Sequence, residues 1–138
     1  MKKIISLIIT TLIFATLIFT VKSYAAPLDT VKFDVNKTVV RPGEEVKATI
    51  DFGKQLGAYT VEVNYDNNIL EYVSVDGGTA NDTTNKVKVT FHDSTGGTNS
   101  RESMSIIFKA KEGITTSNPT ELTATAEGLA NADASETY

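Results

Sequence analysis

Residues that could carry nucleophilic or acid–base chemistry are few in this chain. Its 138 residues include one histidine, His92, and no cysteine. A Cys–His pair is therefore impossible, and a Ser–His–Asp triad would have to use that one imidazole ring. His92 ends an alternating run of apolar and polar residues, which predicts an outward position at the end of a strand.

The 17 acidic residues are the other possible source of chemistry. Glycoside hydrolysis needs two carboxyl groups about 5 to 9.5 Å apart beside a sugar-binding cleft. Acids that occur in alternation, such as Glu62 and Glu71, are typical of solvated strand faces. We therefore predict that the protein is not an enzyme and uses no cofactor.

Oxygen ligands suitable for calcium gather at Asp66, Asn67, Asn68 and Asp76. Their spacing does not match the EF-hand loop. Asp and Asn side chains also form turns by accepting hydrogen bonds from nearby backbone N–H groups. Turn formation explains these residues without a metal, so no metal site is predicted.

Sugars usually bind on exposed aromatic rings, because the apolar face of a sugar stacks on a ring. The chain has no tryptophan and five tyrosines. By strand alternation Tyr59 and Tyr65 point inward, while the face of Tyr72 is undetermined; Tyr24 lies near the N-terminus and Tyr138 is the last residue. A glycan-binding jelly-roll module on the cell surface is thus an alternative with weak support, and a structural surface domain without a ligand is a third.

The N-terminal residues have the features of a secretory leader. Lys2 and Lys3 precede the uncharged apolar residues 4–21, and Ser23 and Ala25 supply small side chains where signal peptidase cleaves. We expect cleavage after Ala25. The apolar run is close to the lower length limit of a membrane span, so the protein would meet a membrane only if this segment were kept as an anchor.

The predicted division is a signal peptide at residues 1–25 and one domain at residues 26–138, secreted or displayed at the surface of a bacterium. Cleavage removes three of the 13 basic residues and none of the 17 acidic ones, which leaves 10 against 17 and a net charge of −7. Such a domain repels nucleic acid. Without cysteines, its stability must come from hydrophobic burial.

Apolar and polar residues alternate repeatedly along the predicted domain, which indicates strands with one buried face. Gly, Pro, Asn and Asp separate the alternating segments and predict turns. The predicted fold class is all-β, an antiparallel β-sandwich of jelly-roll topology. The expected strands are residues 31–36, 46–52, 58–65, 69–75, 86–92, 103–111 and 120–127.

A tight corner is predicted after Tyr65, the last inward residue of its strand. The Asp66 carboxylate can accept hydrogen bonds from N–H groups two or three residues further on. The chain then turns, and Leu70, Val73 and Val75 are expected to enter the core.

Residues 58–78 resemble the hallmark of cohesin domains: a strand ending in Tyr-Asp, a short polar turn, an apolar-Leu-Glu triplet and an alternation that ends at glycine. Three flanking motifs agree, at residues 41–46, 105–111 and 128–133. The resemblance covers nearly all of residues 29–138, with the motifs in the same order.

The resemblance implies a nine-stranded jelly roll that binds a dockerin-bearing protein such as a glycoside hydrolase, and so scaffolds enzymes that degrade polysaccharides or glycans. In the family the partner lies on a sheet face that corresponds here to residues 58–65, 86–92 and 103–111, with the segment near 129–138. The predicted partner-binding residues are Thr60, Glu62, Lys88, Thr90, His92 and Ile107.

This sequence departs from the family pattern in two respects. An Asn and an Asp that contact the partner in well-known cohesins align with Ala58 and Thr60, and a family glutamate aligns with His92. The chain also ends at Tyr138, before the last strand of the family. We therefore expect an open edge at the strand of residues 31–36.

Overall fold

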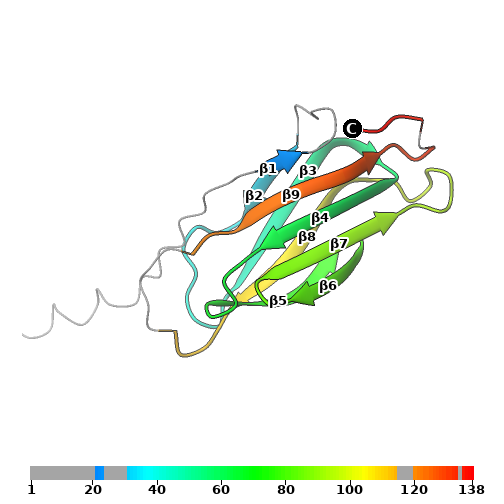
Figure 1. Cartoon of the computed structure of the whole chain (residues 1–138). Coiled ribbons are helices and arrows are strands. Elements are labelled where there is room, and N and C mark those ends of the chain that lie inside the picture. The colour runs from blue at the N-terminus through cyan, green and yellow to red at the C-terminus, as the bar shows by residue number, and fades with distance from the viewer. Residues whose placement is uncertain (1–20, 24–30, 115–119, 134) are drawn as a thin grey trace, which may run out of the picture.

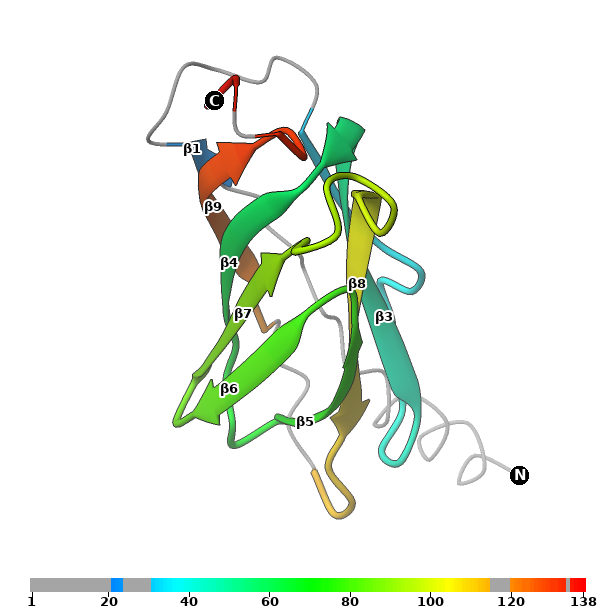
Figure 2. The ribbon, with the colours of Figure 1, turned by 90° about the vertical axis from the view of Figure 1, so that its right-hand side faces the viewer.

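The computed structural model of the chain describes residues 21–23, 31–114, 120–133 and 135–138. Every regular element in these ranges is a β-strand, and the strands form two packed sheets (Figure 1). The five-stranded sheet has the order β1-β9-β4-β7-β6, and the four-stranded sheet has the order β2-β3-β8-β5. Figure 2 shows the two layers from the side. The predicted β-sandwich is confirmed.

The seven strands expected from alternation all occur, with ends that differ by a few residues, and two more are present. β6 was not predicted because its sequence, Thr-Ala-Asn-Asp-Thr, has no apolar alternation. The strands are β1 (Val21–Ser23), β2 (Lys32–Val35), β3 (Glu45–Leu56), β4 (Ala58–Asn64), β5 (Leu70–Asp76), β6 (Thr79–Thr83), β7 (Lys86–His92), β8 (Arg101–Ala110) and β9 (Thr123–Ala130).

The core lies between the sheets and follows the predicted alternation. β4 buries Val61 and Val63, while β8 buries Ile106 and Phe108. Burial of each such side chain stabilises the fold by roughly 1.5–3 kcal/mol, because apolar surface leaves water. The residues between them face outward: on β4 this is the polar Glu62, and on β8 it is the half-buried Ile107.

The corner after β4 forms as predicted. The N–H groups of Ile69 and Leu70 donate to the Asp66 carbonyl at 3.0 and 2.9 Å. The N–H of Asn68 donates to the Asp66 carboxylate at 2.9 Å, which makes the expected Asx turn. Leu70 is buried at the start of β5.

Val73 does not enter the core as the alternation had predicted. Its side chain is 44% exposed. The pairing of β5 with β8 changes register between Tyr72 and Ser74, so one extra residue shifts the alternation. Tyr72 packs against the core in its place.

Two buried tyrosines of the β4 segment hold the chain where it passes from β5 in one sheet to β6 in the other. The Tyr59 hydroxyl donates to the Gly77 carbonyl, and the Tyr65 hydroxyl donates to the Asp82 carboxylate at 2.8 Å. The rings pack on the opposite sheet, with 5.0 Å between the ring centroids of Tyr65 and Phe108. Each ring therefore contributes to the core and its hydroxyl fixes β6.

The single residue between β3 and β4 is a buried glycine, Gly57. Its N–H donates to the Ala130 carbonyl at 2.9 Å, and its carbonyl accepts the N–H of Asp93 at 2.7 Å. A Cβ atom at Gly57 would lie 2.3 Å from the Cα of Ala132. The close approach of these backbone segments therefore requires glycine.

β1 lies within the predicted signal peptide. Its residues pair in parallel with Ala124–Ala126 of β9. The rest of the predicted leader and the predicted cleavage site between Ala25 and Ala26 lie outside the described residues. Cleavage there would remove β1 together with the leader. In the ranges that the structure describes, no helix is long and apolar enough to cross a membrane.

β2 is the outermost strand of the four-stranded sheet, at the position where an open edge was predicted. Its inner side pairs with β3. The N–H of Val35 donates a hydrogen bond to the carboxylate of its neighbour Asp34 at 2.9 Å. A charged side chain on an edge strand disfavours pairing with other chains.

We expect Gly57→Ala to destabilise the fold strongly, because the added methyl group would collide with the backbone of Ala132. The loss should reach the range of severe core substitutions, about 3 kcal/mol or more in the free energy of unfolding. Urea unfolding followed by circular dichroism measures it. Gly96→Asn is the control, since Gly96 is exposed and has no atom within 4 Å of an added Cβ. Equal stability of Gly57→Ala and the wild type would contradict the packing described here.

Alkaline pH should destabilise the fold through the two clamping tyrosines. Burial raises the pKa of Tyr59 and of Tyr65 to about 12, from an ordinary value of 10.0. The folded state therefore keeps protons that the unfolded chain releases. Their stabilisation is complete below pH 10.0 and is lost as the pH rises to about 12.

Urea midpoints measured across this alkaline range test the assignment. The double variant Tyr59→Phe/Tyr65→Phe should be less stable at neutral pH and should show a shallower alkaline decline. A decline as steep as that of the wild type would show that other groups cause it.

Candidate functional site

The outer surface of the five-stranded sheet, formed by outward side chains of β4, β6, β7 and β9, is called the polar face here. Strand pairing places Thr79, Thr90 and Thr60 in one row across β6, β7 and β4. Thr90 is exposed and Thr60 half-buried. The three threonines supply hydroxyl and methyl groups, and the row ends on β9 at Glu127. The two following rows are Asn81, Lys88, Glu62 and Thr125, and then Thr83, Lys86, Asn64 and Thr123.

A three-residue ion cluster lies beside the threonine row. The Glu62 carboxylate is 2.9 Å from the Lys86 ammonium and 3.6 Å from that of Lys88. The hydrogen bond from Lys86 lowers the pKa of Glu62, so this carboxylate stays ionised. Two positive charges against one negative leave the cluster with a charge of +1.

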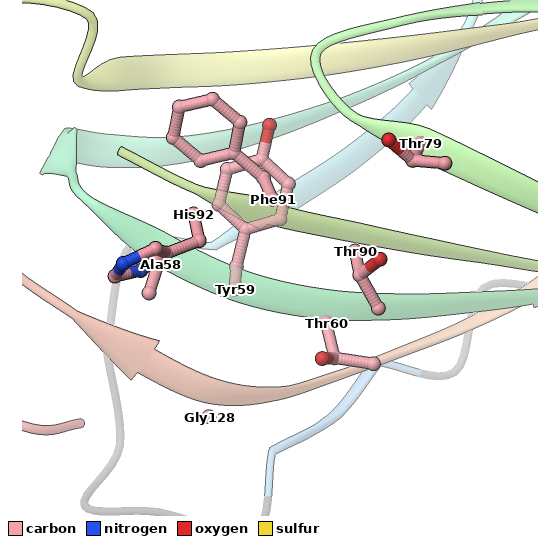
Figure 3. A pocket seen from close by; sticks show the side chains of 8 residues that line it. All are labelled: Ala58, Tyr59, Thr60, Thr79, Thr90, Phe91, His92 and Gly128. Carbon is pink, nitrogen blue, oxygen red and sulfur yellow. The ribbon is translucent and has the colours of Figure 1, made fainter. Parts of the chain in front are cut away.

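A shallow hollow of about 370 Å³ opens on the polar face where β9 runs beside β4. Its floor is low because Ala58 has a short side chain and Gly128 has none. The β4–β9 pairing changes register between Ala58 and Thr60, and Gly128 there has a φ of +61°, which glycine adopts without strain. Figure 3 shows His92 beside Ala58, and Thr60 near Thr90, around this hollow.

The family model of the cohesin domain matches residues 30–137, which is most of the chain. The chain belongs to the cohesin domain family. No curated protein is similar enough to match this cohesin domain.

Solved structures that share its fold include two complexes. One is the sixth cohesin of scaffoldin B from Acetivibrio cellulolyticus, in complex with a mutant Cel5 dockerin; identity is 20%, the TM-score is 0.56, and the match covers 76% of this chain and 89% of that one. The other is a complex of CaDoc0917 with CaCohA2, with 20% identity, a TM-score of 0.59 and coverage of 79% and 92%. At this identity the likeness concerns the fold, and the jelly-roll sandwich predicted for the domain is confirmed.

Five of the six predicted partner-binding residues of this cohesin lie together on the polar face. Ile107 is the exception, because it lies on β8 in the four-stranded sheet, paired with Lys47 and Ser74. The expectation that residues 103–111 form a common face with 58–65 and 86–92 is therefore wrong. Alternation along residues 103–111 indicates an outward side for Ile107, but it cannot assign the residue to a sheet. The five residues on the polar face are Thr60, Glu62, Lys88, Thr90 and His92.

Three features of the cohesin's polar face were not included in the predicted site. Lys86 has the same outward alternation as Lys88, so that signal was available. Thr79 was missed because β6 was not predicted. Gly128 was missed because a register change between two paired strands leaves no signal in the alternation of apolar and polar residues. Each of these features depends on which strands are neighbours.

The alternative sites of this domain receive little structural support. Asp66 precedes β5 and Asp76 ends it, so roughly 20 Å of strand separates Asp76 from the other oxygen groups considered for calcium. Within the described parts of the chain, no group of three His, Cys, Asp or Glu residues lies close enough to hold a metal.

Tyr59 and Tyr65 are buried and Tyr72 is half-buried, so these rings provide no flat platform for a sugar.

A buried carboxylate shapes the loop next to His92. Asp93 is 5% exposed and accepts hydrogen bonds from the N–H groups of Thr95, Gly97 and Asn99 at 2.8, 3.0 and 3.1 Å. A further bond from the Thr95 hydroxyl is the main cause that lowers the pKa of Asp93. The loop is thereby fixed beside the hollow.

We expect Asp93→Asn to loosen this loop and to change the acid stability of the domain. A carboxyl group with a lowered pKa stabilises the fold above its ordinary pKa of 3.8, and this contribution is lost as the pH falls through its lower folded value. The variant should melt several degrees lower at pH 7 and depend less on pH below about pH 5. Thermal melts from pH 7 to pH 2 measure both effects. Glu102→Gln, at an exposed carboxylate, is the control, and identical profiles for Asp93→Asn and the wild type would contradict the assignment.

Proposed function

We propose that this cohesin domain is an exported, non-catalytic module that binds a dockerin-bearing protein through its polar face. The observation that carries the proposal is the arrangement of that face: paired strands present three threonines in one row and a shallow hollow next to the Glu62 ion cluster. Protein interfaces likewise combine uncharged contact residues with polar and charged groups. The fold is shared with cohesins solved in complex with dockerins.

A flat sheet face suits a protein partner better than a small ligand. Rigid strands hold the contact residues in fixed rows, and the hollow of about 370 Å³ could receive one side chain of a partner. A specific interface of standard size buries about 800 Å² on each partner, which is the scale of one sheet face. The dockerin-bearing partner is expected to be a glycoside hydrolase, held in an assembly that degrades polysaccharides or glycans.

Export is the second part of the proposal and depends on the leader. The Lys2–Lys3 start, the apolar run and the small residues before Ala26 support secretion from a bacterium or display at its surface.

Calorimetric titration of the exported chain with a panel of dockerin modules tests the proposed function. At least one dockerin should bind, and Thr60→Arg should weaken that binding by tenfold or more, because a long charged side chain would project over the hollow on the polar face. Thr49→Arg is the matched control, since Thr49 lies on β3 in the other sheet. Failure of the whole panel to bind, or equal losses in the two variants, would refute docking on the polar face.

A further inference from the structure

We infer that the partner presents an acidic side chain to Lys86 and Lys88 while it places an uncharged side chain in the hollow beside Thr60. This inference rests on the proposed function and specifies the chemistry of the docked surface. It is carried by the charge distribution across the polar face and by the lining of the hollow.

The positive charge of the ion cluster is available to a partner. The side chains of Lys86 and Lys88 are each 44% exposed, whereas the Glu62 side chain is 26% exposed. Both lysine side chains are therefore more exposed than the carboxylate that they contact. A partner that covers the cluster therefore meets an excess of one positive charge, which an approaching carboxylate can neutralise with charge-assisted hydrogen bonds.

The other acids of this sheet are placed apart from the cluster's outer surface. Among the described outward residues of β4, β6, β7 and β9, the other carboxylate is Glu127, opposite Thr60 on β9. Asp82 of β6 alternates to the inner side, where its carboxylate accepts the Tyr65 hydroxyl. Glu127 lies two strands and two residues from Lys88, a separation of roughly 12 Å. That exceeds the screening length of about 8 Å at physiological salt. The cluster and Glu127 therefore act as separate charges.

The hollow selects for an uncharged side chain. Its lining consists of threonine hydroxyls, the Ala58 methyl group, the backbone of Gly128, the rings of Tyr59 and Phe91, and His92. The lining contains no Asp, Glu, Lys or Arg to compensate a buried ion, and Glu127, opposite Thr60 on β9, lies outside it. Burial of an unpaired charge is costly, so a neutral side chain that can meet the hydroxyl groups is favoured.

The negative charge of the rest of the domain favours one docking position for an acidic partner. Residues 26–138 have a net charge of −7, with 10 basic against 17 acidic residues. An acidic partner is repelled by most of this surface and attracted at the Lys86–Lys88 pair. Charge complementarity of this kind fixes the orientation of docking and disfavours other approaches.

A display library of the Cel5 dockerin, with its surface positions randomised, tests the inference against the exported chain. Selected binders should be enriched in Asp or Glu at one position. They should lose about tenfold or more in affinity towards Lys88→Glu, and less towards Lys88→Gln. Their binding should also weaken as salt is raised, because the attraction is screened. Lys47→Glu, an exposed lysine on β3, is the matched control and should leave binding unchanged.

These outcomes distinguish the inference about the partner's side chains from the proposed function. Binders that lose affinity towards Thr60→Arg but show no acidic preference and no response to Lys88→Glu would overturn the inference and leave the proposed function standing. A library without binders, or with binders insensitive to Thr60→Arg, would overturn both. Enrichment in Lys or Arg opposite the cluster would also overturn the inference.

Discussion

Two tyrosine hydroxyls hold the sandwich together where its chain crosses between sheets. Tyr59 and Tyr65 lie at the two ends of the β4 segment and bind Gly77 and Asp82, at the start and end of the crossing into β6. β6 itself has few apolar side chains, so its position depends on these bonds and on its pairing with β7. The threonine row of the polar face exists because β6 is held in this register.

Much of the sandwich could be predicted from the sequence, because half-buried strands leave a period-two pattern. The inward sides of β4, β7 and β8 followed this pattern, and the Asp66 turn followed from the hydrogen-bonding habits of Asp. Val73 was predicted wrongly because a register change shifts the alternation. β6 was not predicted because this polar edge strand has no apolar alternation.

The candidate site was harder to predict than the fold, because a binding face is built from strands that are distant in sequence. Thr60, Glu62, Lys88, Thr90 and His92 were placed together correctly because β4 and β7 are neighbours in the sheet. Ile107 was misplaced because alternation gives the side of a residue and not the sheet that carries it. The excess positive charge arises from the convergence of three side chains, Glu62, Lys86 and Lys88, which no single segment contains.

The glycine in the β4–β9 register change gives the polar face an unusual freedom. Gly128 has a left-handed backbone, and an added Cβ would meet no atom within 4 Å. An asparagine, which tolerates this backbone, would project into the hollow and reduce it without disturbing the core. Related modules could therefore diverge in partner choice through one surface position, while the sandwich beneath keeps its stability.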